Sequence, residues 1–290
     1  MKIPISLFIL IAIVFGLILP YGILLEDLFF PIIFILMYLN VLGLKLTLKK
    51  FFRRELIYPI LVNIIVLPLF AYFIGSFLSP YLLFGVVIGA LAPTAMNSTV
   101  YVNLVDGDKE LSVFSTFIMN LIYILYVPLM FFILLRLEIV IPYEQILMKT
   151  FSLIIVPIFL AILTTKALKE KRVKIINFSK KLNLILLPLL LWIIFSINAN
   201  EIWSSLNEVL ITIPVMFLVS IVGFLLGYLA VKKKSLKRTL AIVCGYKNQS
   251  LSLGIVYGLN PLAVIPITVY LLFNHMINLT IIWLFEKKKI

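Results

Sequence analysis

The sequence has almost none of the residues that build disulfide-linked or metal-binding proteins. Among 290 residues there is one cysteine, Cys244, and one histidine, His275. An intrachain disulfide needs two cysteines, and a structural zinc site needs about four Cys or His ligands. Zinc-protease, nucleophile-elbow, P-loop and dinucleotide-binding motifs are absent as well. No nucleophile–base pair is evident beyond the lone His275, so we expect neither an enzyme nor a cofactor.

Charged residues are also scarce. Lysine, arginine, aspartate and glutamate make up 13% of the sequence, whereas 63% of the residues are hydrophobic and the mean hydropathy is +1.20. A water-soluble protein of this length could not cover so much apolar surface. Too little polar sequence is left to build a large domain outside a membrane. The composition therefore indicates a protein that spans a membrane several times.

Ten stretches are long and apolar enough to cross a bilayer, which takes about 20 residues. They are 4–24, 28–46, 56–76, 81–104, 111–135, 146–166, 182–199, 209–230, 238–258 and 262–284. None of the 12 acidic residues lies inside one of them. We predict an all-α polytopic membrane protein with ten transmembrane helices.

The basic residues indicate how these helices are oriented. If the N-terminus is cytoplasmic, the basic clusters at 45–54, 166–181, 232–238 and 287–289 are cytoplasmic too. Basic residues favour that side of the membrane, where they meet anionic lipid head groups. We expect a multi-pass protein of the cell membrane with both termini in the cytoplasm. The net charge of +13 is then explained by orientation and membrane lipid, and no nucleic-acid partner is expected.

The basic connection 166–181 lies near the midpoint and joins two groups of five predicted helices. An odd number of helices per half turns the second half upside down relative to the first. Many secondary transporters consist of such inverted repeats and bind substrate near the bilayer midplane, at interrupted helices. We place the first repeat within 1–165 and the second within 140–290, with the boundary near residue 140.

Interruptions occur in the fourth helix of each half. The first, GALAPTAMNSTVYVN at 89–103, contains Pro93, which removes a backbone donor. The second, CGYKNQSLSLG at 244–254, places Lys247 in the middle of a span. Backbone groups freed in hydrocarbon must find partners or line a wet cavity. The alternative interpretation is that the small residues only aid close helix packing. Polar candidates at the interruptions are Asn97, Ser98, Thr99 and Asn248.

Polar side chains also line two further predicted helices, at a spacing of four residues that keeps them on one face. They are Ser112, Thr116 and Asn120 on the fifth helix, and Tyr270, Asn274 and Asn278 on the tenth. His275 lies beside the second group, where a lone histidine more often forms hydrogen bonds than binds a ligand. The Asp-Gly sequence within VDGDKELS at 105–112 is good turn chemistry, so we expect its carboxylates to be solvated.

Four stretches resemble the bile acid:sodium symporter superfamily. They are FPIIFILMYLNVLGLKLTLKKF (30–51), ALAPTAMNSTVYVNLVDGDKELSVFST (90–116), GYKNQSLSLG (245–254) and NPLAVIPITVYLLFNHMINL (260–279). The resemblance implies ten helices in two domains. The first, second, sixth and seventh helices would form a panel, and the others a core in which the interrupted fourth and ninth helices cross. Substrate would bind between panel and core.

The resemblance places the family's first sodium site on oxygens of the fourth and fifth helices. Ser98, Ser112 and Thr116 stand at ligand positions, and Thr99 stands where an asparagine is usual. Sodium favours several oxygen ligands, preferably with a carboxylate. Because the predicted spans contain no carboxylate, we expect at most a weak sodium site at Ser98, Ser112 and Thr116.

At the second sodium site this sequence departs from the family. The glutamate shared by both sites aligns with Val243, the glutamine that completes the second site aligns with Lys247, and a glutamine of the third helix aligns with Asn63. Asn274 and His275 follow in the reverse of the family's His-Asn order. The resemblance thus favours a shared fold, whereas these replacements argue against ordinary two-sodium coupling.

We therefore expect a secondary active transporter that moves a small organic solute, in particular an organic anion, by alternating access. H⁺ and Na⁺ both remain open as the coupling ion. One alternative is an arsenite- or auxin-type efflux permease of related fold, although arsenite permeases carry a cysteine where this chain has Ala92. The other is a non-transporting membrane receptor or scaffold, which would not need paired broken helices.

We interpret Lys247 as a tethered cation that replaces a bound sodium ion. A lysine at mid-span costs roughly 2.5–3.5 kcal/mol on insertion scales, which marks it as a functional candidate. Release of its proton would make transport proton-linked. Pairing with a substrate carboxylate is a competing role, and a purely structural lysine in a wet cavity is the other alternative. Its ammonium offers three donors. The acceptors that we expect are Ser98, Thr99, Ser112, Thr116 and carbonyls near Pro93.

The charge pattern predicts the topology. Cysteines introduced singly at positions 78, 140 and 204 should react with a membrane-impermeant thiol reagent added outside sealed cells, and a cysteine at position 172 should not. Labelling of position 172 from outside would show that the orientation is inverted.

Overall fold

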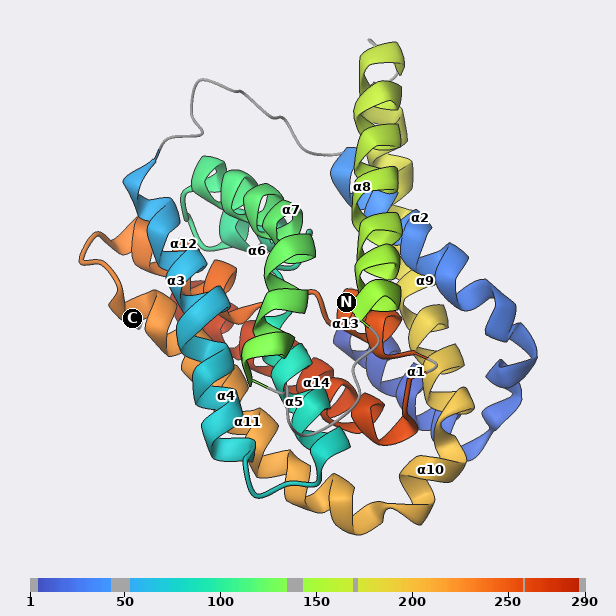
Figure 1. Ribbon diagram of the computed structural model, residues 1–290. Coiled ribbons are helices and arrows are strands. Elements are labelled where there is room, and N and C mark those ends of the chain that lie inside the picture. Colours follow the sequence, from blue (N-terminus) through green and yellow to red (C-terminus); the bar gives the residue numbers. More distant parts are fainter. Residues whose placement is uncertain (1–4, 43–52, 135–142, 169–171, 258, 287–290) are drawn as a thin grey trace. The chain divides into compact units, whose positions relative to one another are not determined.

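The computed structural model describes all residues except 1–4, 43–52, 135–142, 169–171, 258 and 287–290, and it is built from helices (Figure 1). Within these described residues, six helical stretches are long and apolar enough to cross a membrane. They are Pro20–Leu42, Arg54–Gly75, Lys109–Leu134, Glu144–Ala167, Leu206–Leu229 and Pro261–Phe285. The all-α polytopic class is thus confirmed, while the number of ten crossings stays a prediction.

The chain divides into two compact units, of which the first comprises Met1–Leu44 and Phe151–Leu206. In this unit α9 (Arg172–Ile197) contacts α1 (Ile5–Ile18), the 3₁₀ segment η1 (Pro20–Leu28) and α2 (Phe29–Leu42). A short helix, α10 (Ala199–Ser204), follows α9. The chain approaches α9 closely at Gly16 and Gly22, where a Cβ atom would clash with Phe195 and Ser196. Small residues at such contacts let helices pack tightly in a membrane.

The second unit comprises Lys45–Thr150 and Asn207–Ile290. The helix Arg54–Gly75 is made of η3 (Arg54–Leu56), α3 (Ile57–Leu61), the π-helical η4 (Val62–Val66) and α4 (Leu67–Gly75). The other helices are α5 (Pro80–Leu91), α6 (Ser98–Leu104), α7 (Lys109–Leu134), α11 (Leu206–Leu229), α12 (Lys234–Gly245), α13 (Gln249–Val256) and α14 (Pro261–Glu286). Helix α8 (Tyr143–Leu168) begins in this unit and ends in the first.

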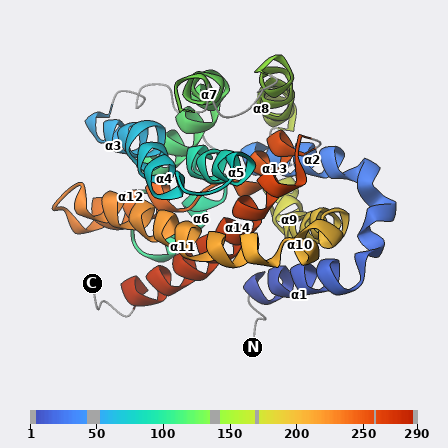
Figure 2. The same ribbon diagram turned by 60° about the horizontal axis from the view of Figure 1, so that its bottom comes forward.

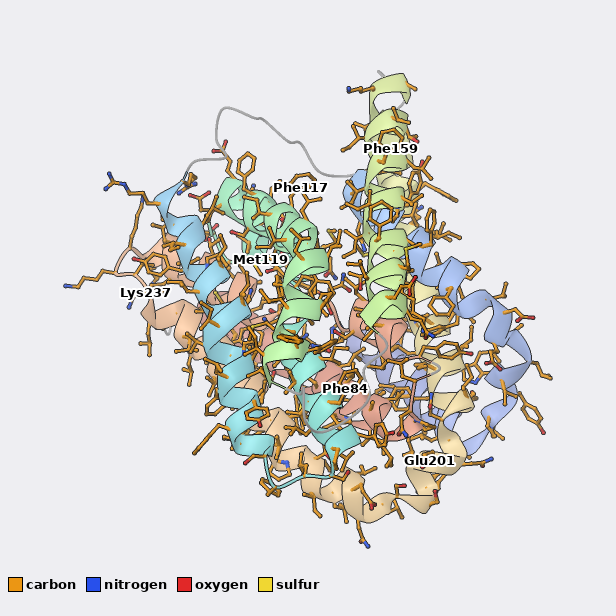
Figure 3. The ribbon with its side chains drawn as sticks, viewed as in Figure 1. Phe84, Phe117, Met119, Phe159, Glu201 and Lys237 are labelled. Atoms are coloured by element: carbon orange, nitrogen blue, oxygen red, sulfur yellow. The ribbon has the colours of Figure 1, made fainter. Side chains whose placement is uncertain are left out.

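The core of the second unit lies between its apolar helices. Helix α5 runs beside α4 and α14, and the two views of the ribbon agree on this (Figures 1 and 2). Phe84 of α5 has its ring centroid 5.0 Å from that of Phe131 of α7. Phe84 of α5 and Met119 of α7, both labelled in Figure 3, are buried. Gly227 of α11 lies so close to the Leu240 carbonyl of α12 that a Cβ atom would not fit.

Two helix boundaries differ from the sequence prediction. The connection expected at 166–181 is largely helical, because α8 continues to Leu168 and α9 begins at Arg172 rather than at residue 182. Lysine and arginine are good helix formers, and this segment has no glycine or proline to stop a helix. Helix α1 ends at Ile18 rather than near residue 24, since Pro20 cannot continue it.

The acidic turn between α6 and α7 is only partly solvated, which corrects the prediction for it. Asp106 is exposed and has a positive φ of 53°. Asp108 instead accepts a hydrogen bond from the Arg53 guanidinium at 2.8 Å, and its backbone N–H donates to the Thr239 hydroxyl at 2.6 Å. It also caps α7, because Oδ1 accepts the Leu111 N–H at 2.9 Å. Asp108 therefore links the start of α7 to α12 and to the residue before η3.

The surroundings of Asp108 determine its protonation. Partial burial acts to raise the pKa of the carboxyl, but the Leu111 N–H and the Arg53 guanidinium outweigh it, and the pKa lies below its ordinary value. A carboxyl whose pKa is depressed by folding stabilises the protein above its unfolded pKa. That contribution is lost as the pH falls through the folded pKa.

Replacing Asp108 with asparagine should remove the charge pair but keep the helix cap, since asparagine caps as well as aspartate. A half-exposed pair of this kind is worth roughly 0.2–1 kcal/mol. We expect the wild type to be more stable than the variant by about this amount at neutral pH, and the difference to shrink below about pH 4. Thermal unfolding of both proteins at neutral pH and below about pH 4 measures this stability difference. A difference that does not change with pH would contradict the charge pair between Asp108 and Arg53.

Candidate functional site

Both predicted interruptions are present in the second unit. Helix α5 ends at Leu91, and Ala92 is extended with ψ of 136°, as the residue before a proline usually is. Helix α6 begins only at Ser98. Helix α12 ends at Gly245, and the chain stays non-helical until α13 begins at Gln249. Each interruption frees backbone groups that a continuous helix would pair.

The two interruptions pair with each other. The Ala95 N–H donates to the Tyr246 carbonyl at 2.9 Å, and the Asn248 N–H donates to the Pro93 carbonyl at 2.8 Å. Thr94 and Lys247 thus face each other in a short antiparallel bridge. In hydrocarbon no water can take over these backbone groups, so the pairing stabilises both breaks at once.

The carbonyls at the end of α5 bind side chains from other helices. A helix leaves its last four carbonyls without intrahelical partners. Ser252 and Gln249 of α13 donate to the carbonyls of Ile88 at 3.2 Å and Gly89 at 3.0 Å. The Tyr126 hydroxyl of α7 donates to the Leu91 carbonyl at 2.7 Å. Gln249 and Ser252 belong to the polar stretch around Lys247 that the sequence showed, whereas Tyr126, a polar residue inside an apolar helix, was not predicted.

Two asparagines hold the paired segments from opposite sides. Asn120 Nδ2 donates to the Thr94 carbonyl at 3.0 Å and to the Thr116 carbonyl at 2.8 Å. Asn274 Nδ2 donates to the Lys247 carbonyl at 2.9 Å, and its Oδ1 accepts the Lys247 N–H at 3.4 Å. The polar faces predicted on α7 and α14 therefore both meet the interruptions.

Four hydroxyl groups form a cluster between α6 and α7, and we call them the hydroxyl cluster. Ser98 Oγ lies 2.9 Å from Thr116 Oγ1 and 3.4 Å from Ser112 Oγ, and Thr99 Oγ1 lies 3.1 Å from Ser112 Oγ. Ser98, Ser112 and Thr116 are fully buried. These are the residues that the sequence assigned to a weak sodium site, and the structure brings them together.

Asn97 and His275 lie in a separate polar group around Tyr246. Asn97 Nδ2 donates to the Tyr246 hydroxyl at 3.4 Å, and that hydroxyl lies 3.4 Å from His275 Nδ1. The Tyr246 ring contacts the His275 ring edge to face, with centroids 5.4 Å apart. His275 is thus a hydrogen-bonding residue in the core, as its isolation in the sequence suggested.

Lys247 has a different partner from those predicted. Its ammonium donates to Asn63 Oδ1 at 2.7 Å, and not to Ser98, Thr99, Ser112, Thr116 or a carbonyl near Pro93. The lysine is only 3% exposed and Asn63 is fully buried. That expectation was wrong because Tyr246 is extended and Lys247 lies in the β-bridge, and successive side chains of an extended segment point to opposite sides. Tyr246 points to Asn97 and His275, so Lys247 points away from them to the helix that carries Asn63.

Asn63 lies in η4, the π-helical segment Val62–Val66. A π-segment holds an extra residue within a helix and turns the side chains around it, and such segments are frequent at functional sites. Within the described residues, Asn63 Nδ2 has no hydrogen-bond partner, and neither do Gln249 Oε1 and Ser220 Oγ. Buried polar atoms of this kind usually bind water or a ligand.

Comparison with known protein families identifies the group to which this chain is related. The family model described as the Sodium Bile acid symporter family matches residues 28–205, more than half of the 290 residues. The chain belongs to the sodium bile acid symporter family. A comparison with curated proteins finds no match. Symporters carry solutes across membranes, so membership agrees with the transporter class and with the apolar helices described above.

Replacing Tyr126 with phenylalanine should destabilise the protein by about 1–3 kcal/mol, because it leaves the buried Leu91 carbonyl without a partner. Tyr123→Phe is the matched control on the same helix. Its hydroxyl contacts Ser252 only at 3.5 Å, so we expect a smaller loss. Thermal unfolding of both variants measures the difference. Equal losses would show that the α5 carboxyl end does not depend on Tyr126.

Proposed function

We propose that this protein is a secondary active transporter that moves a small organic anion by alternating access, with the Lys247 ammonium as a fixed cation in place of a bound sodium ion. Family membership supports transport. The paired interruptions support a site near the bilayer midplane, where transporters with broken helices bind their substrates.

The observation that carries the proposal is the contact between Lys247 and Asn63. Both residues stand where the resemblance places glutamines of the family's second sodium site, and their side chains meet at 2.7 Å. The shared glutamate of that site is replaced by Val243, which is fully buried. One fixed positive charge needs less negative compensation than two sodium ions, which accounts for the loss of the carboxylate.

The division of the chain supports a moving core and a panel. The first unit contains the first and seventh predicted spans and most of the second and sixth, which are the spans that the resemblance assigns to the panel. The second unit contains the other spans, and with them both interruptions. In our proposal the first unit is the panel and the second unit is the core of an alternating-access transporter. The two five-helix halves of the chain are inverted repeats.

Binding of a sodium ion in the hydroxyl cluster would be energetically unfavourable. Its four hydroxyls already bond to one another, so a sodium ion would have to replace those hydrogen bonds without a carboxylate. We therefore favour coupling to protons through Lys247, with at most weak sodium binding at Ser98, Ser112 and Thr116. An efflux permease of related fold is the second candidate, and Ala92 at the position of the arsenite permeases' cysteine disfavours an arsenite substrate.

The test uses the purified full-length protein. A thermal-shift screen against small organic acids would first identify a ligand, since binding to the folded state raises its apparent stability. Uptake of that acid into proteoliposomes should be unchanged when sodium is replaced by choline, and should be lost in Lys247→Ala. Lys237→Ala, on the preceding helix, is the matched control and should retain uptake.

A reverse design tests the charge replacement. Val243→Glu combined with Lys247→Gln restores the two side-chain types that the family's sodium site uses. We expect this double variant to gain sodium-dependent thermal stability that the parent lacks. Strong sodium dependence of the parent protein would refute the fixed-cation proposal, and normal uptake by Lys247→Ala would refute any role of this lysine in transport.

A further inference from the structure

Within the described residues, no acidic side chain forms an ion pair with the Lys247 ammonium. None of the 12 acidic residues falls within a predicted span. The described ion pairs of the second unit, Arg53 with Glu55 and with Asp108, lie at helix ends. A buried charge is costly unless it is both hydrogen-bonded and paired. Asn63 Oδ1 supplies the hydrogen bond, but it carries no charge.

The same contact leaves donors unused. An ammonium has three donors, and in the described structure one of those of Lys247 meets an acceptor, Asn63 Oδ1. Because the amide oxygen of Asn63 faces the lysine, the amide nitrogen is left over, and it is buried without a partner. In the part of the chain that the structure describes, the Lys247 ammonium thus meets one acceptor, the Asn63 amide oxygen, and the Asn63 amide nitrogen meets none.

We propose that Lys247 and Asn63 bind a small monovalent anion, either chloride or the carboxylate of a small organic acid. The anion would accept hydrogen bonds from Lys247 Nζ and Asn63 Nδ2 and neutralise the ammonium. A metal cation is repelled by the lysine, and a water molecule would satisfy the amide but leave the charge unpaired. The anion is monovalent because it balances one lysine.

The neighbouring packing limits the ligand to a small group. Leu67, one turn beyond Asn63, is fully buried. A Cβ atom at Gly223 of α11 would lie 3.3 Å from Leu67 and from the Cys244 carbonyl, so α11 closes tightly on this region. A halide or a single carboxylate fits such surroundings better than a large anion does. This anion site rests on the proposed function in one respect, which is that Lys247 carries its proton.

The first experiment measures anion dependence directly. Thermal unfolding of the full-length protein would be recorded at fixed pH and ionic strength in sodium chloride, choline chloride, sodium acetate and sodium gluconate. We expect a saturable rise of the unfolding temperature with chloride, equal for sodium and choline, relative to the bulky gluconate. A response to chloride alone identifies a halide site, and a response to acetate as well identifies a carboxylate site. Equal unfolding temperatures in chloride, acetate and gluconate would overturn the proposal.

Asn63→Asp is the decisive variant. Aspartate has almost the same shape as asparagine, and its carboxylate would supply the negative charge that the bound anion supplies in the wild type. The variant should lose the anion response and be at least as stable in gluconate as the wild type is in chloride. Asn40→Asp makes the same chemical change at another intramembrane position, where Asn40 Oδ1 accepts from Asn183. It should retain the response. If Asn63→Asp does not fold, Lys247→Met removes the charge instead and should also abolish the response.

The outcomes separate this site from the transport function. An unchanged anion response in Asn63→Asp or Lys247→Met would overturn the site even if uptake requires Lys247. An anion response without any uptake would support the site and reject the transport proposal. Uptake that depends on Lys247, without any anion response, would support the transport proposal and reject the anion site.

Discussion

The structure of the second unit depends on the partners of backbone groups in a medium that supplies none. An unpaired backbone group costs several kcal/mol in hydrocarbon. Two helices can be broken there only because each break provides what the other lacks. The segments around Pro93 and Tyr246 exchange two backbone hydrogen bonds, and α13 supplies side chains to the carbonyls that α5 leaves free. Either interruption alone would be unstable, which explains why they occur as a pair.

This pairing of the two interruptions also determines where the charged Lys247 side chain points. The bridge between Thr94 and Lys247 holds both residues extended, and the alternation of an extended chain sends Tyr246 and Lys247 to opposite sides. Tyr246 completes an uncharged group with Asn97 and His275. Lys247 reaches Asn63 in the π-helical segment, away from the hydroxyl cluster. The separation of the hydroxyl oxygens from the fixed cation therefore follows from backbone geometry at three residues.

The sequence was informative where hydrophobicity and helix breakers decide the structure. Composition predicted the membrane class, and Pro93 and the polar stretch around Lys247 marked where helices would break. The spacing of Ser112 and Thr116 placed them on one face, where they meet Ser98. The partner of Lys247 could not be predicted in the same way, since it depends on where α12 ends to within a single residue. The pairing of Asp108 was also missed, because turn chemistry predicts a turn but not that Arg53, distant in sequence, lies beside it.

The two polar sites are physically connected. The Thr94 carbonyl, opposite Lys247, accepts from Asn120, which also donates to the Thr116 carbonyl, and Thr116 bonds Ser98 in the hydroxyl cluster. Moving Lys247 away from Asn63 with its backbone would strain the bridge to Thr94, and then the bond to Asn120. Each hydrogen bond in this series satisfies a buried polar group for which no water is available as an alternative partner. The hydroxyl cluster and the lysine should therefore move as one body, so that a charge change at Lys247 is transmitted to the hydroxyl cluster through the backbone rather than through space.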